Sequence, residues 1–258
     1  MPTTVITGAA SGIGAAAATK LAALGHQIIG IDLKNADICA NLSTTAGRQQ
    51  AIDDVISKTT GTIDHLICCA GLGPQVDPAT LVSSVNYFGT VALLDGLFNA
   101  LQKGKNPSAV VISSNSARLQ SFDGNPLLDA YLQNDETQVN QIISEADPRG
   151  AGHLAYASSK NAIGCAIRQR ALVWGNAGVR LNAVAPGAVE TPLLQAGLQD
   201  SRYGQLIRDF VAPLGRRGTP QEIAALIAYL IGEDAGFIHG SVFFIDGGLD
   251  AQCRPTAF

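Results

Sequence analysis

The sequence predicts an α/β fold built on a parallel sheet, and three observations support this prediction. Strand patterns and helix patterns alternate along all 258 residues. A glycine-rich turn joins the first predicted strand to the first predicted helix. Hydrophobic residues make up 47% of the chain and charged residues 15%, which suits a large buried core. Because no stretch resembles a linker, we expect one domain over residues 1–258.

The glycine-rich turn predicts a nucleotide site. β-branched residues over 3–7 predict a buried strand, and the alanine-rich run 15–24 predicts a helix. Between them, Gly8, Gly12 and Gly14 form the pattern Gly-x-x-x-Gly-x-Gly. Such glycines let the backbone approach a bulky anion, and the start of the helix offers free N–H groups to a pyrophosphate. The alternative is a turn that only needs positive φ, but the flanking strand and helix favour the nucleotide site.

The predicted strand 27–31 ends at Asp32, which lies 18 residues after Gly14. In dinucleotide-binding folds, an acidic residue near this spacing binds the hydroxyls of the adenosine ribose. A carboxylate there would repel a 2′-phosphate, so NAD(H) is favoured over NADP(H). Lys34 is the one nearby residue that could weaken this preference. Alternatively, Asp32 is a turn residue or a helix cap.

The rest of the chain continues the alternation. Further strands are expected over 63–69, 107–112, 179–184 and 241–245, and helices over 43–59, 79–103, 153–174 and 223–231. Ser114 follows a strand, and ligands of open parallel sheets bind at the carboxyl ends of strands. Asn86 lies inside a predicted helix, where its amide competes for backbone groups. It either breaks the helix to serve a site or occupies an exposed polar position.

Residues 116–150 do not fit the alternation of strands and helices. An Asn-Pro pair at 125–126 predicts a helix start. The apolar residues that repeat at helical spacing are Leu128, Leu132, Val139 and Ile143. We therefore expect a helix-turn-helix insertion with an apolar stripe. The stripe could fold back on its own domain, form a wall of the substrate site or contact another subunit, and we expect a homodimer or homotetramer.

Tyr156 and Lys160 are four residues apart on a helix expected from His153 to Trp174, so both project from one face. A free phenol titrates at about 10 and is a poor base at neutral pH. An ammonium one helical turn away favours the phenolate, and an oxidised nicotinamide adds positive charge. The pair therefore suits proton transfer with an alcohol oxygen, with Tyr156 as acid/base and Lys160 lowering its pKa. Alone, such a pair is also typical of an exposed helix surface.

In this order, the motifs resemble those of the short-chain dehydrogenase/reductase family along nearly the whole chain. The residues that carry the resemblance are Thr7-Gly8-x-x-x-Gly12-Ile13-Gly14, Ala70-Gly71, Asn86, Ser114, Tyr156-x-x-x-Lys160, Pro186-Gly187 with Thr191, and Asp246-Gly247-Gly248. The resemblance implies a Rossmann-like, doubly wound parallel sheet of seven strands. The helical insertion would lie between the fifth strand and the helix of the catalytic tyrosine.

The resemblance also implies a catalytic tetrad of Asn86, Ser114, Tyr156 and Lys160. Ser114 would orient the substrate oxygen as charge develops on it, and Asn86 would hold a water that relays the proton. Lys160 could also hold the nicotinamide ribose. No metal is implied. The residues implied to bind NAD are Gly8, Ser11, Gly12, Ile13, Gly14, Asp32, Asn41, Leu42, Ala70, Gly71, Tyr156, Lys160, Pro186, Gly187, Val189 and Thr191.

Two departures from the family pattern concern the cofactor site. Cys68-Cys69 stands before Ala70-Gly71 where the family usually has two asparagines. We expect this change to alter packing near the cofactor without removing backbone contacts. Asn41 stands where the family often has an aspartate that faces the adenine.

Within the family, the chain is similar to bacterial enzymes that interconvert 3α-hydroxysteroids and 3-oxosteroids and reduce other carbonyls. This closer resemblance is carried by residues 69–74, 85–89, 192–196 and 254–256. The leucine-rich substrate loop 188–215 fits a flat, apolar alcohol or ketone. One alternative is a dehydrogenase of aryl, terpenoid or lignin-derived alcohols with the same tetrad. Another is a non-catalytic dinucleotide sensor, against which the intact Tyr156 and Lys160 argue.

Composition argues against several other classes of protein. The net charge of −4 gives no electrostatic reason to expect nucleic acid or an anionic membrane as partner. We expect no secretory signal and no membrane span, since the apolar run Ile223 to Ile231 is too short. Five cysteines with no metal-ligand spacing indicate reduced thiols and a cytoplasmic protein.

Overall fold

The computed structural model describes residues 1–118 and 121–256. Seven parallel strands form one sheet in the order β3-β2-β1-β4-β5-β6-β7. The strands are β1 (Thr3–Thr7), β2 (Gln27–Asp32), β3 (Ile38–Cys39), β4 (His65–Cys68), β5 (Ser108–Ile112), β6 (Arg180–Pro186) and β7 (Val242–Ile245). The chain runs outward from β1 to β3 and then returns to β4 beside β1, so the predicted doubly wound parallel sheet is confirmed.

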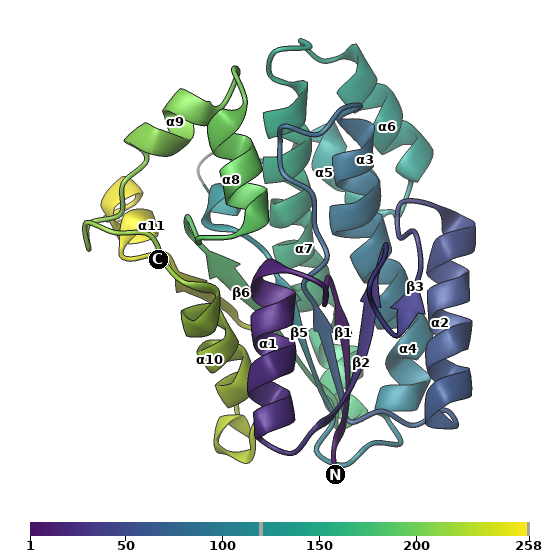
Figure 1. Ribbon diagram of the computed structural model, residues 1–258. Coiled ribbons are helices and arrows are strands. Elements are labelled where there is room, and N and C mark those ends of the chain that lie inside the picture. The colour runs from purple at the N-terminus through teal and green to yellow at the C-terminus, as the bar shows by residue number, and fades with distance from the viewer. Residues whose placement is uncertain (119–120, 257–258) are drawn as a thin grey trace.

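Helices cover both faces of this sheet (Figure 1). On one face lie α1 (Gly12–Ala23) and α10 (Pro220–Ile231). On the other lie α2 (Thr45–Thr59), α4 (Thr90–Leu101) and α7 (Ala151–Asn176). The shorter helices are α3 (Thr80–Ser83), α5 (Pro126–Leu132), α6 (Glu136–Glu145), α8 (Pro192–Gln199), α9 (Gly204–Asp209) and α11 (Leu249–Cys253), with a π-helical turn η1 (Ser84–Gly89) and 3₁₀ turns η2 (Asn115–Arg118) and η3 (Glu233–Ala235).

The strands are apolar on both sides because both faces of the sheet are covered. Val5 packs in the core beneath α2, α4 and α7, whereas its neighbour Ile6 packs in the core beneath α1 and α10. Leu66 and Ile67 divide between the two cores in the same way. Alternate residues of a strand point to opposite faces, so a strand of a covered sheet needs an unbroken apolar run.

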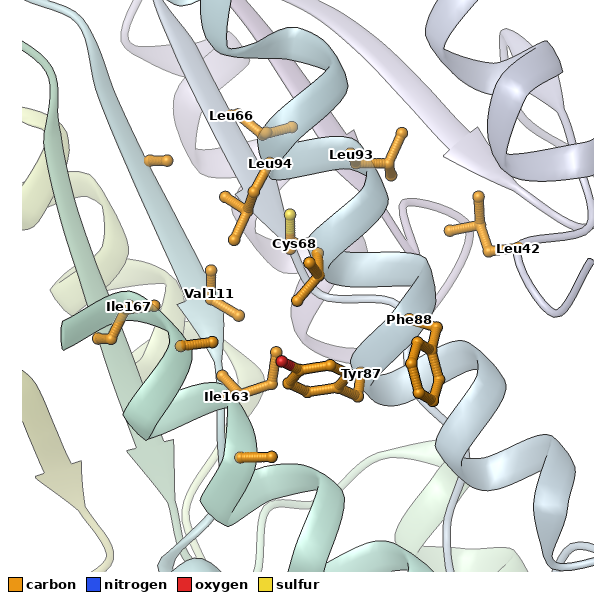
Figure 2. Close-up of a cluster of buried hydrophobic side chains, with 14 of the residues drawn as sticks. Leu42, Leu66, Cys68, Tyr87, Phe88, Leu93, Leu94, Val111, Ile163 and Ile167 are labelled. Carbon is orange, nitrogen blue, oxygen red and sulfur yellow. The ribbon is translucent and has the colours of Figure 1, made fainter. Parts of the chain in front are cut away.

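The larger core holds α7 against the sheet. Figure 2 shows Ile163 and Ile167 of α7 beside Val111 of β5, with Leu94 and Tyr87 from the preceding helical stretch. All of these side chains are at most 2% exposed. Close packing of this kind fixes the rotation of α7 about its axis, which sets the direction of Tyr156 and Lys160 on the same helix.

Six of the seven strands are predicted by patterns in the sequence, and β3 is the strand that is not. It is two residues long and pairs Ile38 with Ile31 and Cys39 with Asp32. A periodicity cannot be recognised in two residues. A sheet of seven strands, and not six, was therefore expected through the family resemblance alone. The short strand places the residues that follow it next to the end of β2.

The insertion folds back on its own domain, which decides between the three alternatives for its apolar stripe. Leu128 is 8% exposed, Val139 and Ile143 are at most 1% exposed, and Leu132 is half-buried against the same core. The hydroxyl of Tyr131, also in the insertion, lies 2.6 Å from that of Ser83. The stripe is therefore largely covered by its own domain. Residues 119–120 of the predicted insertion lie outside the described residues.

The expectation that no apolar segment reaches membrane-spanning length is wrong for one stretch. Residues Thr80–Leu101, formed by α3, a π-helical turn and α4, are long and apolar enough by composition. However, 67% of the most apolar window is buried inside the fold, as in a core helix.

Within the described residues the five cysteines are free thiols, and no cluster of potential metal ligands is present there.

A buried histidine at the amino end of the sheet makes stability depend on pH. His65 is 4% exposed, and its Nδ1 lies 2.9 Å from the hydroxyl of Ser108. Burial, aided by the charges of His26 and Arg180, lowers the pKa of His65 to about 4. In the unfolded chain the pKa is about 6.5, so between these values the unfolded state binds more protons and stability rises with pH.

We therefore predict that the stabilising contribution of neutral His65 is complete above about pH 6.5 and is lost as the pH falls towards 4. The loss is at most about 3.5 kcal/mol, at about 1.4 kcal/mol for each pH unit. Urea unfolding between pH 7.5 and 4.5 would measure it in the wild type and in His65→Asn. The variant should lose clearly less stability over this range; equal losses would contradict the prediction.

Candidate active site

The carboxyl ends of the central strands surround a cavity of about 610 Å³. Every residue expected to bind the cofactor lines it, as do Ser114, Tyr156 and Lys160. Asn86 does not line it. Further lining residues, which were not among those expected to bind the cofactor, are Leu33, Ala40, Ser43, Cys69, Leu72, Val76, Leu81, Val85, Ile112, Ser113, Ala188, Pro192, Leu193 and Leu194. Most of them are chain neighbours of predicted residues, which is the only signal that could have indicated them.

The glycine turn has a separate steric reason for each glycine. Gly8 has a φ of +68°, and a Cβ there would lie 2.8 Å from the backbone nitrogen of Ala70. Gly12 has a φ of +55°, and a Cβ at Gly14 would overlap the carbonyl oxygen of Gly8. Ser11 precedes α1 without a side-chain capping bond, so its hydroxyl leaves the N–H groups of the first turn available. The turn can therefore present these groups to an anion in the cavity.

Asp32 occupies the end of β2 at the edge of the cavity. Its carboxylate accepts hydrogen bonds from the backbone N–H groups of Ala10 (3.0 Å) and Leu33 (2.7 Å). Asp32 is thus a turn residue as well as a cavity residue, and the two interpretations of the sequence are compatible. Lys34 is exposed and does not line the cavity.

Lys160 is a buried cation at the centre of the site. It is 4% exposed, and its Nζ donates a hydrogen bond of 2.8 Å to the carbonyl oxygen of Ile112 at the end of β5. The hydroxyl of Ser113 donates back to the carbonyl oxygen of Lys160, also at 2.8 Å. Burial lowers the pKa of Lys160 to about 8, because removing an ammonium from water disfavours its charged form.

The pKa of Tyr156 differs from the sequence prediction. Burial raises it, and a hydrogen bond with Ser114 opposes this rise without reversing it. Lys160 is not among the groups that shift this pKa; its ammonium group donates instead to the carbonyl oxygen of Ile112. A raised pKa keeps the phenol protonated, which suits a proton donor better than a base.

Asn86 is placed by a π-helical turn, η1 (Ser84–Gly89), between α3 and α4. It is 1% exposed, so the interpretation as an exposed polar residue is wrong. Its Oδ1 accepts from the N–H of Leu72 (2.7 Å), and its Nδ2 donates to the carbonyl oxygen of Leu72 (3.0 Å). Asn86 thereby holds the loop that carries Gly71 at the cavity wall, a positioning contact that the sequence analysis missed.

One end of the cavity is apolar. Its wall includes Leu72, Val76 and Leu81 from the loop after β4 and from α3, and Leu193 and Leu194 from α8. Thr191 caps α8 by accepting a hydrogen bond from the N–H of Leu194, which fixes the orientation of these leucines. The predicted substrate loop therefore contributes a hydrophobic surface to the cavity that Tyr156 and Ser114 also line.

The substrate loop is also held at its outer side. Arg202 donates to the carbonyl oxygen of Gln75 (2.9 Å) and pairs with Asp77 at 3.1 Å and Asp200 at 3.0 Å. The hydroxyl of Tyr203 donates to the carbonyl oxygen of Arg149 (3.1 Å). Contacts to the loop after β4 and to the end of the insertion thus keep α8 and α9 beside the cavity.

Comparison with known proteins identifies the family. Residues 2–131 match the family model for short chain dehydrogenase, and residues 128–250 match that for enoyl-(acyl carrier protein) reductase. A 3-alpha-hydroxysteroid dehydrogenase/carbonyl reductase of Comamonas testosteroni is 53% identical over 98% of both chains. This chain belongs to the short-chain dehydrogenase/reductase family. The resemblance seen in its motifs is therefore confirmed, and it is an oxidoreductase of that family.

Two further members are informative. The crystal structure of a 3-alpha-hydroxysteroid dehydrogenase from Pseudomonas sp. B-0831, complexed with NADH, is 50% identical, with a TM-score of 0.96 over 99% of this chain and 100% of that one. A coniferyl-alcohol dehydrogenase of Pseudomonas sp. strain HR199 is 30% identical over 95% of both chains. The same fold in this family thus serves a steroid and an aryl alcohol.

The position of Asp32 leads to a prediction about cofactor preference. Asp32→Ser should lower the ratio of NADH affinity to NADPH affinity by about tenfold or more, because the carboxylate both binds ribose hydroxyls and repels a 2′-phosphate. Cofactor fluorescence titrations measure both dissociation constants. Asp53→Ser, at an exposed position of α2, is the matched control. An unchanged ratio in Asp32→Ser would exclude this role.

Proposed function

We propose that this protein interconverts 3α-hydroxysteroids and 3-oxosteroids with NAD(H), and that it reduces other apolar ketones. The observation that carries the proposal is the cavity, in which Tyr156, Ser114 and Lys160 adjoin an apolar wall. The identity of 53% to the Comamonas enzyme supports the steroid as substrate. The NADH complex of the Pseudomonas enzyme supports the cofactor.

The residues of the cavity fit a dinucleotide. The turn over 8–14 would hold the pyrophosphate, Asp32 the adenosine ribose, and Lys160 the nicotinamide ribose. The close approach of Gly8 to Ala70 leaves no room for a side chain, so backbone groups border the cavity there. When bound, NAD(H) supplies the hydride chemistry, and the protein supplies orientation and electrostatics.

The protein's own side chains would transfer the proton that the carbonyl oxygen of the substrate needs. In reduction, Tyr156 would give its phenolic proton to the carbonyl oxygen, since burial keeps that phenol protonated. Ser114 would donate a hydrogen bond to the same oxygen as negative charge develops on it. The side chain of Asn86 is bonded to Leu72, so it would hold the loop at the cavity wall, and the replacement proton would come from water. In oxidation, the deprotonated Tyr156 would instead accept the proton of the substrate hydroxyl group, and Ser114 would bond to the same oxygen.

An aryl or lignin-derived alcohol is the second candidate substrate, because the coniferyl-alcohol dehydrogenase is 30% identical over 95% of the chain. Both candidates can be tested by following NADH absorbance with a panel of 3-oxosteroids, 3α-hydroxysteroids and aryl alcohols. We expect the highest kcat/KM for a steroid. A higher value for an aryl alcohol would favour the second candidate, and turnover of none would favour a non-catalytic dinucleotide sensor.

We also propose that the protein works in the cytoplasm as a homodimer or homotetramer. The five free thiols in the described residues support a reducing compartment. Because the insertion's apolar stripe is buried, it gives no support to association. Sedimentation equilibrium measures the number of subunits.

The role of Tyr156 leads to a kinetic prediction. Tyr156→Phe should bind NADH with wild-type affinity but lose turnover by about a hundredfold or more, because general acid–base catalysis contributes about that much. Tyr229→Phe, at a tyrosine that is 48% exposed on α10, is the matched control and should keep full activity. Near-normal turnover in Tyr156→Phe would remove Tyr156 from the proposed mechanism.

A further inference from the structure

Arg48 is a buried cation that touches the wall of the cofactor cavity from behind. Its side chain, on α2, is 8% exposed. Its Nε donates to the carbonyl oxygen of Leu42 at 2.8 Å, and its Nη2 lies 3.3 Å from the carbonyl oxygen of Ser43 and 2.9 Å from that of Ser84. Leu42 and Ser43 line the cavity. Arg48 therefore ties two lining residues to the start of the π-helical turn.

The counter-charge of Arg48 comes from the insertion. Glu136, the first residue of α6, accepts from Nη1 at 2.6 Å and from Nη2 at 2.8 Å. This bidentate geometry matches the planar guanidinium fork. Asp135 caps α6 by accepting from the N–H of Gln138, so the carboxylate of Glu136 projects from a fixed helix start.

The wall held by Arg48 belongs to the end of the cavity that Asp32 occupies. The N–H of Ala40 donates to the carbonyl oxygen of Asp32 at 2.9 Å, and the chain then runs through Asn41 to Leu42 and Ser43. Lys160 and Tyr156 come from a different element, α7. If Asp32 holds the adenosine ribose, as proposed above, residues 41–43 face the adenosine part of the cofactor.

We propose that Arg48 and Glu136 form a positioning pair through which the insertion fixes the adenosine side of the cofactor site. A buried guanidinium that loses its carboxylate is left with an uncompensated charge, so it would turn towards water and release the carbonyl oxygens of Leu42 and Ser43. The wall would then lose its fixed shape. This inference rests on the proposed function, in which the cavity binds NAD(H).

The test compares Glu136→Gln with Asp95→Asn. Asp95 accepts a bidentate pair of hydrogen bonds from Arg170, at 2.8 and 2.7 Å, and neither residue lines the cavity. Both variants thus lose one carboxylate of a bidentate pair between helices. The ligands are NADH and reduced nicotinamide mononucleotide, which lacks the adenosine. Dissociation constants are measured by fluorescence, and kcat is measured at saturating NADH.

We expect Glu136→Gln to weaken NADH binding by about tenfold. The substitution removes the charge from the two hydrogen bonds between Glu136 and Arg48, and hydrogen bonds to charged groups contribute enough free energy for a change of this size. Its affinity for the mononucleotide and its kcat should stay within about twofold of wild type, and Asp95→Asn should leave all three within about twofold. Equal weakening of both ligands, or unchanged NADH affinity, would overturn the proposal. If Glu136→Gln does not fold, Arg48→Lys, which keeps the charge but loses the fork, takes its place with the same expectations.

Amide hydrogen exchange provides a second measurement that needs no cofactor. The N–H groups of Ser43 and Thr44 are bonded to Asn41 within the wall. They should exchange faster in Glu136→Gln than in wild type or Asp95→Asn, and equal rates would overturn the proposal. Failure of the wild-type protein to bind either nucleotide would instead overturn the proposed function.

Discussion

The site depends on the buried ammonium of Lys160 and its bond to the carbonyl oxygen of Ile112. This bond joins α7, which carries Tyr156, to the end of β5, which leads to Ser114. Burying an ammonium opposes folding, as its lowered pKa shows. The packing of Ile163 and Ile167 against the sheet compensates for this cost (Figure 2). The apolar core and the polar site therefore share one helix, α7.

Buried cations bound to backbone carbonyl oxygens recur in this fold. Arg48 bonds to carbonyl oxygens at the cavity wall. At the opposite end of the sheet, Arg180 donates to the carbonyl oxygens of Leu230, Ile231, Gly232 and Ala235. These groups lie at and just beyond the end of α10, where the helix dipole is negative. Both arginines therefore fix the backbone conformation of a turn, which side-chain packing alone would restrict less.

The parts of the fold and the site that the sequence predicts are those with a local signal. The glycine turn, the acidic residue at the end of β2 and the Tyr156–Lys160 spacing each depend on neighbours within one turn or one strand. Asn86 was ambiguous, because its partner Leu72 lies 14 residues away and meets it only through a π-helical turn. The rise that burial causes in the pKa of Tyr156 was also not predicted, since spacing indicates which charges are near but not how deeply a group is buried.

The insertion shows most clearly what local patterns leave open. Its helical spacing correctly indicated two amphipathic helices. An apolar stripe predicts that one face of a helix is buried, but it does not indicate which part of the protein covers that face. Glu136 reaches Arg48 across 88 residues, and the carbonyl oxygen of Arg149 accepts from Tyr203 in the substrate loop. None of the described residues of the insertion lines the cavity. A segment added between β5 and α7 can therefore shape both ends of the site while contributing no residue to its surface.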